Sequence, residues 1–255
     1  MEQEIALSWK GIAAAYLLLI PALLLIRYYK LDAAKEVLFS VLRMSIQLFL
    51  VGIYLNYIFL WNHWAINLLW VLVMIAAAGW TTIRQAKLPV RSYFFPVFTA
   101  FLCSFLSVLF YFVILVIGKS PSAAAVFLPV AGMLLGNSMR SNVIVLQRFS
   151  TLFRERTKEY QLRLMLGATD REALEPFLSA SLKAGIAPQI ATMATLGIVS
   201  LPGMMTGQLL GGSTPVTAIE YQIVIMIGIF VVQLFSSAFL LHRVAGQLLR
   251  ESSLP

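Results

Sequence analysis

The side chains best suited to chemistry on a small solute are two neighbouring methionines, Met204 and Met205, which follow Pro202 and Gly203. Thioethers suit soft cations such as Cu(I) better than hard cations such as Mg²⁺. Pro202 has no amide donor and glycine weakens a helix, so we expect the helix to break here. Broken backbone at membrane depth is tolerated where protein buries it or water reaches it. These four residues are therefore candidates for a transport pathway, with flexible apolar packing as the alternative for the methionines.

Clusters that would indicate an enzyme are absent from the sequence. Asp32 and Asp170 are the only aspartates, and Cys103 is the only cysteine. His63 and His242 fall near opposite membrane faces of the predicted helices, so they cannot share a metal ion. No H-E-x-x-H or G-x-S-x-G motif occurs. We therefore expect no catalytic residue, and the metal ligands stay unknown.

Three polar side chains in the other apolar runs are candidates for the pathway. Arg43 and Gln47 lie four residues apart, on one face of a predicted helix. An arginine at the bilayer centre costs about 2.5–3.5 kcal/mol and is a functional candidate by default, although Arg43 can also snorkel to the headgroups. Asn137, in a later run, offers an amide for the pathway or for contacts between helices.

Long apolar helices must position these residues. The 255 residues are 60% hydrophobic and 12% charged, whereas soluble domains carry about 25% charged residues. A helix that crosses the bilayer needs roughly 20 apolar residues. The sequence predicts an all-α polytopic transmembrane helix bundle of about seven spans, forming a single domain over residues 1–255. The seven apolar runs are Gly11–Ile26, Val37–Leu60, Ala65–Ile83, Tyr93–Ile117, Ala124–Leu146, Ile186–Leu210 and Ile219–Leu241.

The formal charge of +8 indicates orientation rather than a nucleic-acid partner. Most of the nineteen lysines and arginines fall in the connections after the first, third and fifth runs and after the last one. Because Lys and Arg favour the cytoplasmic side, we expect the N-terminus outside and the C-terminus inside, with membrane lipid around the bundle.

One connection is longer and more polar than the others, over residues 148–175. Gly167 suits the left-handed position that ends a helix, and Thr169 with Glu172 forms a capping box that starts a short new one. The segment either simply joins two spans or presents a coupling helix that docks in a groove of a soluble partner. The apolar residues available for docking are Leu166, Ala168, Ala173 and Leu174.

Four blocks of sequence carry a family resemblance. They are "SVLRMSIQLFLVG" (40–52), "LPVAGMLLGNSM" (128–139), "LMLGATDREAL" (164–174) and "LGIVSLPGMMTGQLLGGSTPVTAIEYQI" (196–223). In this order they resemble the iron-export permease family of ABC transporters, which is related to plant aluminium-tolerance permeases. The resemblance covers nearly the whole chain, and the last block is the most specific.

The resemblance implies a multi-pass permease of the bacterial plasma membrane that exports iron or another metal ion. It implies a homodimer of permeases with two ATP-binding cassette subunits, which would hold ATP and Mg²⁺. This chain has no phosphate-binding loop and no expected cofactor of its own. The rival interpretation is a stand-alone secondary transporter or channel. By resemblance, the contact with the ATPase involves Glu159, Leu166, Gly167, Ala168, Thr169, Glu172 and Ala173.

Overall fold

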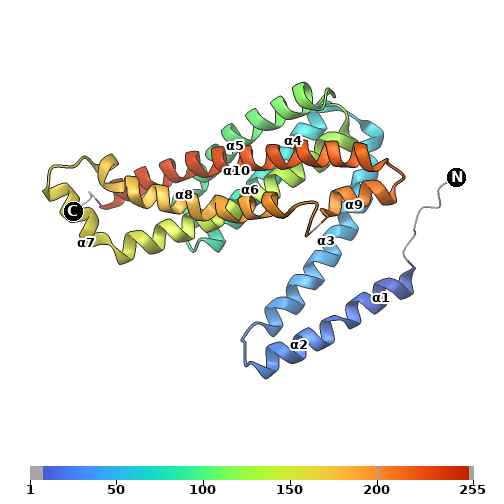
Figure 1. Cartoon of the computed structure of the whole chain (residues 1–255), viewed down its shortest axis with the longest axis horizontal. Helices are drawn as coiled ribbons and strands as arrows, with labels where there is room; N and C mark the ends of the chain where they lie inside the picture. The colour runs from blue at the N-terminus through green and yellow to red at the C-terminus, as the bar shows by residue number, and fades with distance from the viewer. Residues whose placement is uncertain (1–7, 200, 253–255) are drawn as a thin grey trace.

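The computed structural model describes residues 8–199 and 201–252 (Figure 1). Within these residues its regular elements are all helices, which confirms the all-α part of the predicted fold class. They are α1 (Trp9–Leu17), α2 (Leu19–Tyr28), α3 (Ala34–Trp61), α4 (Trp64–Gln85), α5 (Val90–Tyr111), the π-helix η1 (Phe112–Val116), α6 (Ala124–Glu155), α7 (Thr157–Met165), α8 (Asp170–Thr195), α9 (Gly203–Leu210) and α10 (Pro215–Ser252).

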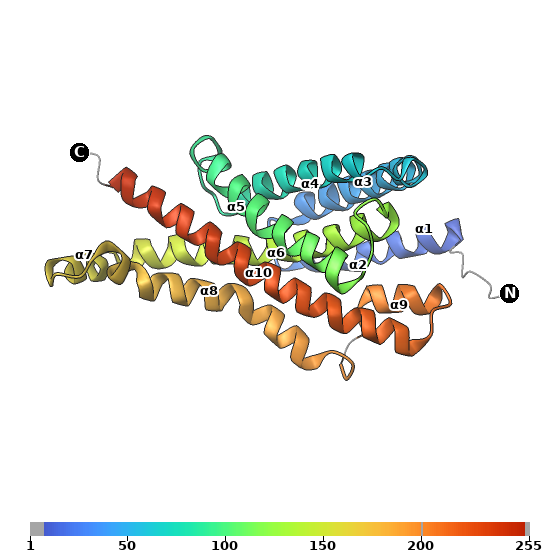
Figure 2. The ribbon, with the colours of Figure 1, turned by 90° about the horizontal axis from the view of Figure 1, so that it is seen from above.

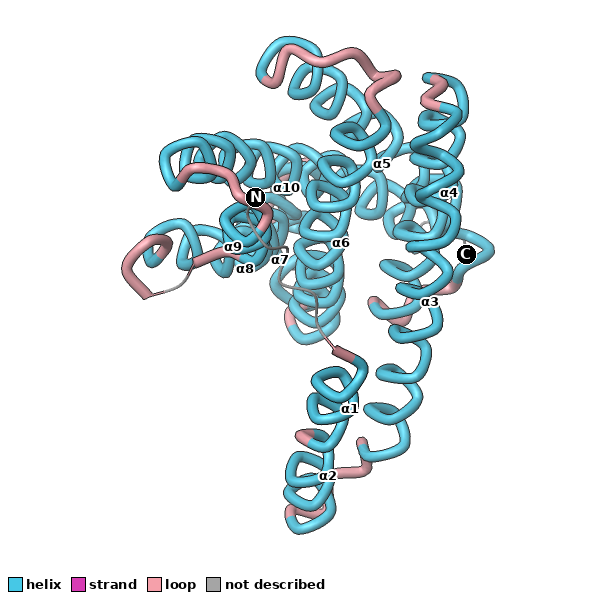
Figure 3. Tube along the Cα trace, turned by 90° about the vertical axis from the view of Figure 1, so that its right-hand side faces the viewer, coloured by secondary structure: helices cyan, strands magenta, loops and turns pink. Residues whose placement is uncertain are grey.

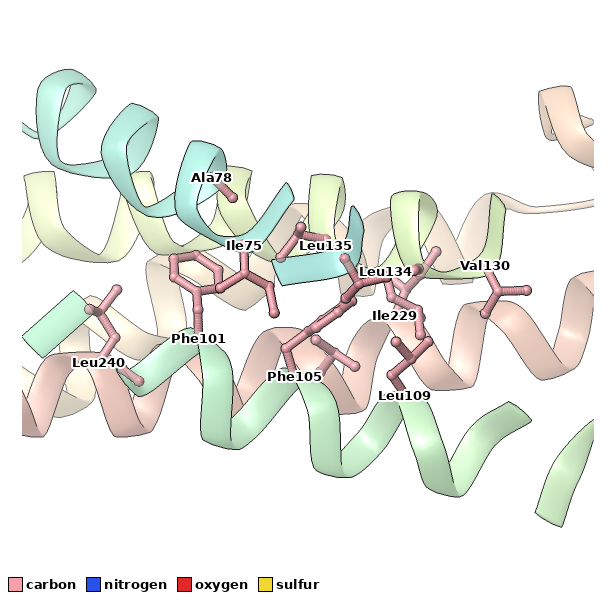
Figure 4. Packing of buried hydrophobic residues seen from close by; sticks show 14 of the residues in the cluster. Ile75, Ala78, Phe101, Phe105, Leu109, Val130, Leu134, Leu135, Ile229 and Leu240 are labelled. Atoms are coloured by element: carbon pink, nitrogen blue, oxygen red, sulfur yellow. The ribbon is translucent and has the colours of Figure 1, made fainter. Parts of the chain in front are cut away.

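Helix α10 is the central element of the bundle. It runs diagonally along the molecule and contacts α5, α6, α8 and α9 (Figure 2). On α5, Phe101, Phe105 and Leu109 recur every four residues, and all are fully buried. They pack with Ile75 of α4 and Ile229 of α10 in the main core (Figure 4). Lipid tails are as apolar as these side chains, so close packing rather than expulsion from water holds such a bundle together.

The first three helices form an arm that leaves this bundle. Helices α1 and α2 contribute no buried residue, and Ile58 is the one buried residue of α3. In Figures 1 and 3, α1 and α2 lie apart from α8, α9 and α10. A hydrogen bond between the hydroxyls of Tyr16 and Ser45 joins α1 to α3. Most exposed side chains of the arm are apolar, as expected for helices in lipid.

Within the residues that the structure describes, five helical segments are long and apolar enough to cross a membrane. They are Trp9–Tyr28, Ala34–Trp61, Trp64–Gln85, Val90–Val116 and Pro215–Gln247. The predicted fifth span, Ala124–Leu146, falls on α6, and the predicted sixth span, Ile186–Leu210, begins in the last part of α8 and ends in α9. Helices α6 and α8 have 32 and 26 residues, and at about 1.5 Å per residue each exceeds a 30 Å core. Both carry more polar side chains than the five apolar segments.

The predicted sixth run, Ile186–Leu210, is not one continuous helix. Helix α8 ends at Thr195, and the chain reaches α9 through Leu196–Pro202, with a positive φ of 81° at Gly197. Pro202 is the N-cap of α9, where its missing amide costs nothing. The break predicted at Pro202 therefore exists, but it begins six residues earlier, at Leu196.

Candidate functional site

The turn between α7 and α8, residues Leu164–Glu172, is called the elbow below. At Gly167 the backbone is left-handed, with φ +91°. The amide of Gly167 donates to the carbonyl of Leu164, and the amide of Ala168 donates to that of Arg163, both at 3.0 Å. This pair of bonds is the Schellman motif, and it satisfies carbonyls that the end of α7 would otherwise leave unpaired.

The predicted capping box starts α8. The carboxylate of Glu172 accepts from the Thr169 amide at 2.8 Å and from the Thr169 hydroxyl at 2.7 Å. The hydroxyl accepts in turn from the Glu172 amide at 3.4 Å. The bond from the Thr169 backbone, and then that from its hydroxyl, lower the pKa of Glu172. The box does not open a separate short helix, because α8 continues from Asp170 through Pro176 to Thr195.

A second core ties the elbow to the bundle. Tyr160 of α7 packs against Phe153 of α6 with ring centroids 5.4 Å apart, and Phe153 packs edge-on against Phe177 of α8. The Tyr160 hydroxyl also donates to Asp170 at 2.7 Å. Burial first, and then this bond, raise the pKa of Tyr160 to about 12. Leu241 of α10 belongs to the same core. Helix α7 therefore packs directly on α6 and α8, in a core that α10 also joins.

The outer side of the elbow exposes an apolar patch. Leu162, Met165 and Leu166 are 56%, 82% and 79% exposed on a helix whose other residues are mainly polar. Their spacing of three and four residues puts them on one face, which identifies Leu162 and Met165 as contact candidates that were not predicted. Ala173, in contrast, is fully buried in the core that α7 shares with α6 and α8, so its contact with a partner stays a prediction that this surface does not support. Glu159 lies on α7, where it is ion-paired with Arg163 at 3.1 Å.

A groove of about 730 Å³ lies beside the elbow along the first half of α8. Its walls carry both signs of charge, from Arg171, Glu172, Glu175 and Lys183, and His242 of α10 closes one side. Thr169 of the capping box also lines it. The groove and the exposed apolar patch together give the elbow the features of a protein-docking surface.

The predicted pathway residues do not meet in one place. Arg43 and Gln47 are exposed on α3, in the arm, and do not face the bundle interior. Asn137 is half-buried, and its side-chain amide donates to the carbonyl of Met133 at 2.8 Å. The two methionines separate: Met204 packs against the main core, whereas Met205 lines a cavity near Pro202. Gly203 is the first residue of α9.

Instead, the structure reveals a buried polar column between α6, α8 and α10. Its members are Ser138, Ser141 and Asn142 of α6, Gln189 of α8, and Gln233, Ser236 and Ser237 of α10, all at least nine-tenths buried.

Hydrogen bonds join the column across the helices. The hydroxyls of Ser138 and Ser236 are 2.5 Å apart, and Ser237 donates to Asn142 at 2.7 Å. Gln233 donates to the backbone carbonyl of Asn137 at 3.2 Å. Yet Nε2 of Gln189 and Oε1 of Gln233 have no hydrogen-bond partner. Such unmet groups are costly in an apolar medium, and they make the column a place where water or a solute gains hydrogen bonds.

Gly185 lets α6 and α8 approach closely enough to close the column. A Cβ at this position would collide with Val145 and would lie 3.1 Å from the hydroxyl oxygen of Ser141. That hydroxyl donates to the carbonyl of Gly185, also at 3.1 Å. The part of the chain that the structure describes contains no cluster of three His, Cys, Asp or Glu side chains that could hold a metal ion. The column therefore offers neutral oxygen and nitrogen groups rather than a charged metal cage.

Comparison with known proteins places these features in a family. The model of a family described as "Uncharacterised protein family (UPF0014)" matches residues 9–249. The chain is 31% identical to the UPF0014 membrane protein YjkA of Bacillus subtilis, over 86% of this chain and 87% of YjkA. It is 31% identical to the probable iron export permease protein FetB of Escherichia coli, over 85% and 82% of the two chains.

A plant relative extends the comparison. The protein ALUMINUM SENSITIVE 3 of Arabidopsis thaliana is 28% identical over 84% of this chain and 77% of its own length. No solved structure matches the chain. The resemblance inferred from the four sequence blocks is thus confirmed. With its apolar helices and a match over nearly its whole length, the chain belongs to the UPF0014 family of membrane proteins.

Proposed function

We propose that this chain is the permease subunit of an exporter of iron or another metal ion, driven by a separate ATP-binding subunit. One observation carries the proposal: the elbow exposes an apolar patch on one side and packs onto the helices of the polar column on the other. The relationship to a probable iron export permease supports the choice of cargo. We expect the protein in the bacterial plasma membrane.

In this proposal the chain crosses the membrane seven times. Helices α6 and α8 add two spans to the five apolar ones, and their lower hydropathy is what helices that line a polar column require. The elbow and the C-terminal end of α10 lie at one end of the molecule, and α9 lies at the other (Figure 2). Because most arginines and lysines fall in segments at the elbow end, the positive-inside rule makes that end cytoplasmic.

The ATP-binding subunit would bind at the elbow and move it. Leu162, Met165 and Leu166 would insert into a groove of the ATP-binding subunit, and a segment of that subunit would fill the charged groove along α8. ATP and Mg²⁺ would be held by the partner, which carries out hydrolysis. Closure of two such subunits, on a homodimer of permeases, would shift α7. The contacts of Phe153 and Tyr160 would pass that shift to the column, so that it opens alternately to each side.

Coupling is tested with the purified complex of this chain and its ATP-binding subunit in lipid nanodiscs. We expect Fe²⁺ or another exported ion to stimulate ATP hydrolysis. The double variant Met165→Asp/Leu166→Asp should abolish the stimulation and weaken subunit binding, while the permease alone remains folded. Stimulation and binding equal to those of the wild type would overturn the proposal. A stand-alone secondary transporter or channel would instead transport without any ATPase.

A further inference from the structure

A cavity of about 500 Å³ lies between the end of α8, α9 and the first turns of α10. Each of these helices contributes one methionine to its wall: Met193 from α8, Met205 from α9 and Met226 from α10. The fourth notable lining residue is Gln222 of α10, and the remaining ones are aliphatic residues, glycine and proline. This set of residues is called the thioether cavity below.

Gln222 provides an independent sign that the cavity holds a ligand. Its side chain is only 8% exposed, and its Oε1 has no hydrogen-bond partner. An amide oxygen buried without a donor is unfavourable, and proteins rarely leave one unpaired without a ligand, an ion or ordered water. Because Gln222 lines the cavity, rotation of its side-chain amide would bring this oxygen to a cation held there.

The chemistry of the lining selects the kind of cation. No Asp, Glu, His or Cys lines the cavity, so it supplies no anionic oxygen for a hard divalent cation such as Mg²⁺. Three neutral, polarisable thioethers with one amide oxygen match a soft monovalent cation, Cu(I) or Ag(I). If the wall only had to pack or to contact lipid, leucine would serve equally well at each of the three positions.

We propose that the thioether cavity binds a soft monovalent cation through Met193, Met205 and Met226, with Gln222 completing the site. The cavity continues the polar column along α8, where Gln189 and Met193 are four residues apart and share a face. Helix α9, which borders the cavity, lies at the end of the molecule opposite the elbow (Figure 2). The proposal rests on the proposed function only in treating the cation as cargo that reaches the exit of the column.

The test measures binding of Ag(I), which is redox-inert, to the purified chain in nanodiscs by isothermal titration calorimetry. Met193→Leu/Met205→Leu/Met226→Leu removes the three thioethers at nearly constant volume, and we expect at least about tenfold weaker binding, equivalent to about 1.4 kcal/mol. The matched control is Met204→Leu: this neighbour of Met205 packs in the main core, and its replacement should leave the Ag(I) affinity within about twofold of the wild type.

Single variants keep the test decisive if the triple variant does not fold. Each of Met193→Leu, Met205→Leu and Met226→Leu should weaken Ag(I) binding on its own. The proposal is overturned if the wild type does not bind Ag(I), or if the thioether variants bind it as tightly as the wild type. Because the measurement uses neither nucleotide nor partner, such a failure would leave the coupling experiment standing, and a failure of coupling would leave this binding result standing.

Discussion

Gly167→Val is the substitution that most specifically perturbs the backbone of the elbow. With φ +91°, position 167 is strained for any residue that has a Cβ, whereas no atom lies within 4 Å of where that Cβ would be. The effect is therefore a backbone effect rather than a collision. Holding a residue other than glycine in such a conformation costs about 1–3 kcal/mol.

The free-energy cost of this strain is comparable to the stability that the hydrogen bonds of the turn contribute. The two Schellman bonds, from Gly167 to Leu164 and from Ala168 to Arg163, contribute about 0.5–1.5 kcal/mol each. We therefore expect valine to open the elbow in a large fraction of molecules. A net change of about 1.4 kcal/mol lowers the ratio of closed to open elbows about tenfold, and the affinity for an ATP-binding subunit should fall with it.

The assay is metal-stimulated ATP hydrolysis by the complex, with hydrogen exchange of the Gly167 and Ala168 amides as a direct readout of the turn. The matched control is Gly52→Ala in α3, another glycine with no atom within 4 Å of a new Cβ but with helical backbone. It should leave both readouts unchanged. The claim that the elbow carries the coupling would be refuted by one combination of results. In the Gly167→Val complex, the two amides would exchange faster, yet metal would stimulate ATP hydrolysis as strongly as in the wild type.

Three further outcomes are expected. Gly185→Ala should destabilise the α6–α8 contact by about 1–3 kcal/mol through collision with Val145, and adding Val145→Ala should restore most of the loss in thermal unfolding. Because the pKa of Glu172 is lowered in the folded protein, the capping box stabilises the start of α8 fully above the usual carboxyl pKa of 4.5. This stability is lost as the pH falls through the lower pKa of the folded state. Glu172→Gln should remove the pH dependence of amide exchange at Thr169. Tyr160→Phe should cost about 0.5–1.5 kcal/mol, because it removes the hydrogen bond to Asp170, and should loosen α7 in the same exchange experiment.

The elbow could be predicted from the sequence because its signals are local. A glycine that ends a helix and the pair Thr169 and Glu172 act within a few residues, so neither needs knowledge of the fold. The burial of Ala173 could not be predicted this way, since it depends on how α6, α7 and α8 pack together. The extent of α8 was missed because Pro176 and Pro188, which usually interrupt helices, both lie inside it.

The residues that face the bundle interior could be predicted only in part, because they too depend on how the helices pack together. Periodicity correctly put Arg43 and Gln47 on one helical face, but which face meets the bundle is decided by tertiary packing, which leaves both exposed in the arm. The signal that was overlooked is Gln233, Ser236 and Ser237, which are polar at spacings of three and four residues inside the apolar helix α10.

The most direct test of the account is metal transport in inside-out vesicles that contain this chain, with and without its ATP-binding subunit. The account predicts that metal ions accumulate inside only when both subunits and ATP are present, and that Met165→Asp/Leu166→Asp abolishes the accumulation. Uphill accumulation by this chain alone, driven by an ion gradient, would contradict it.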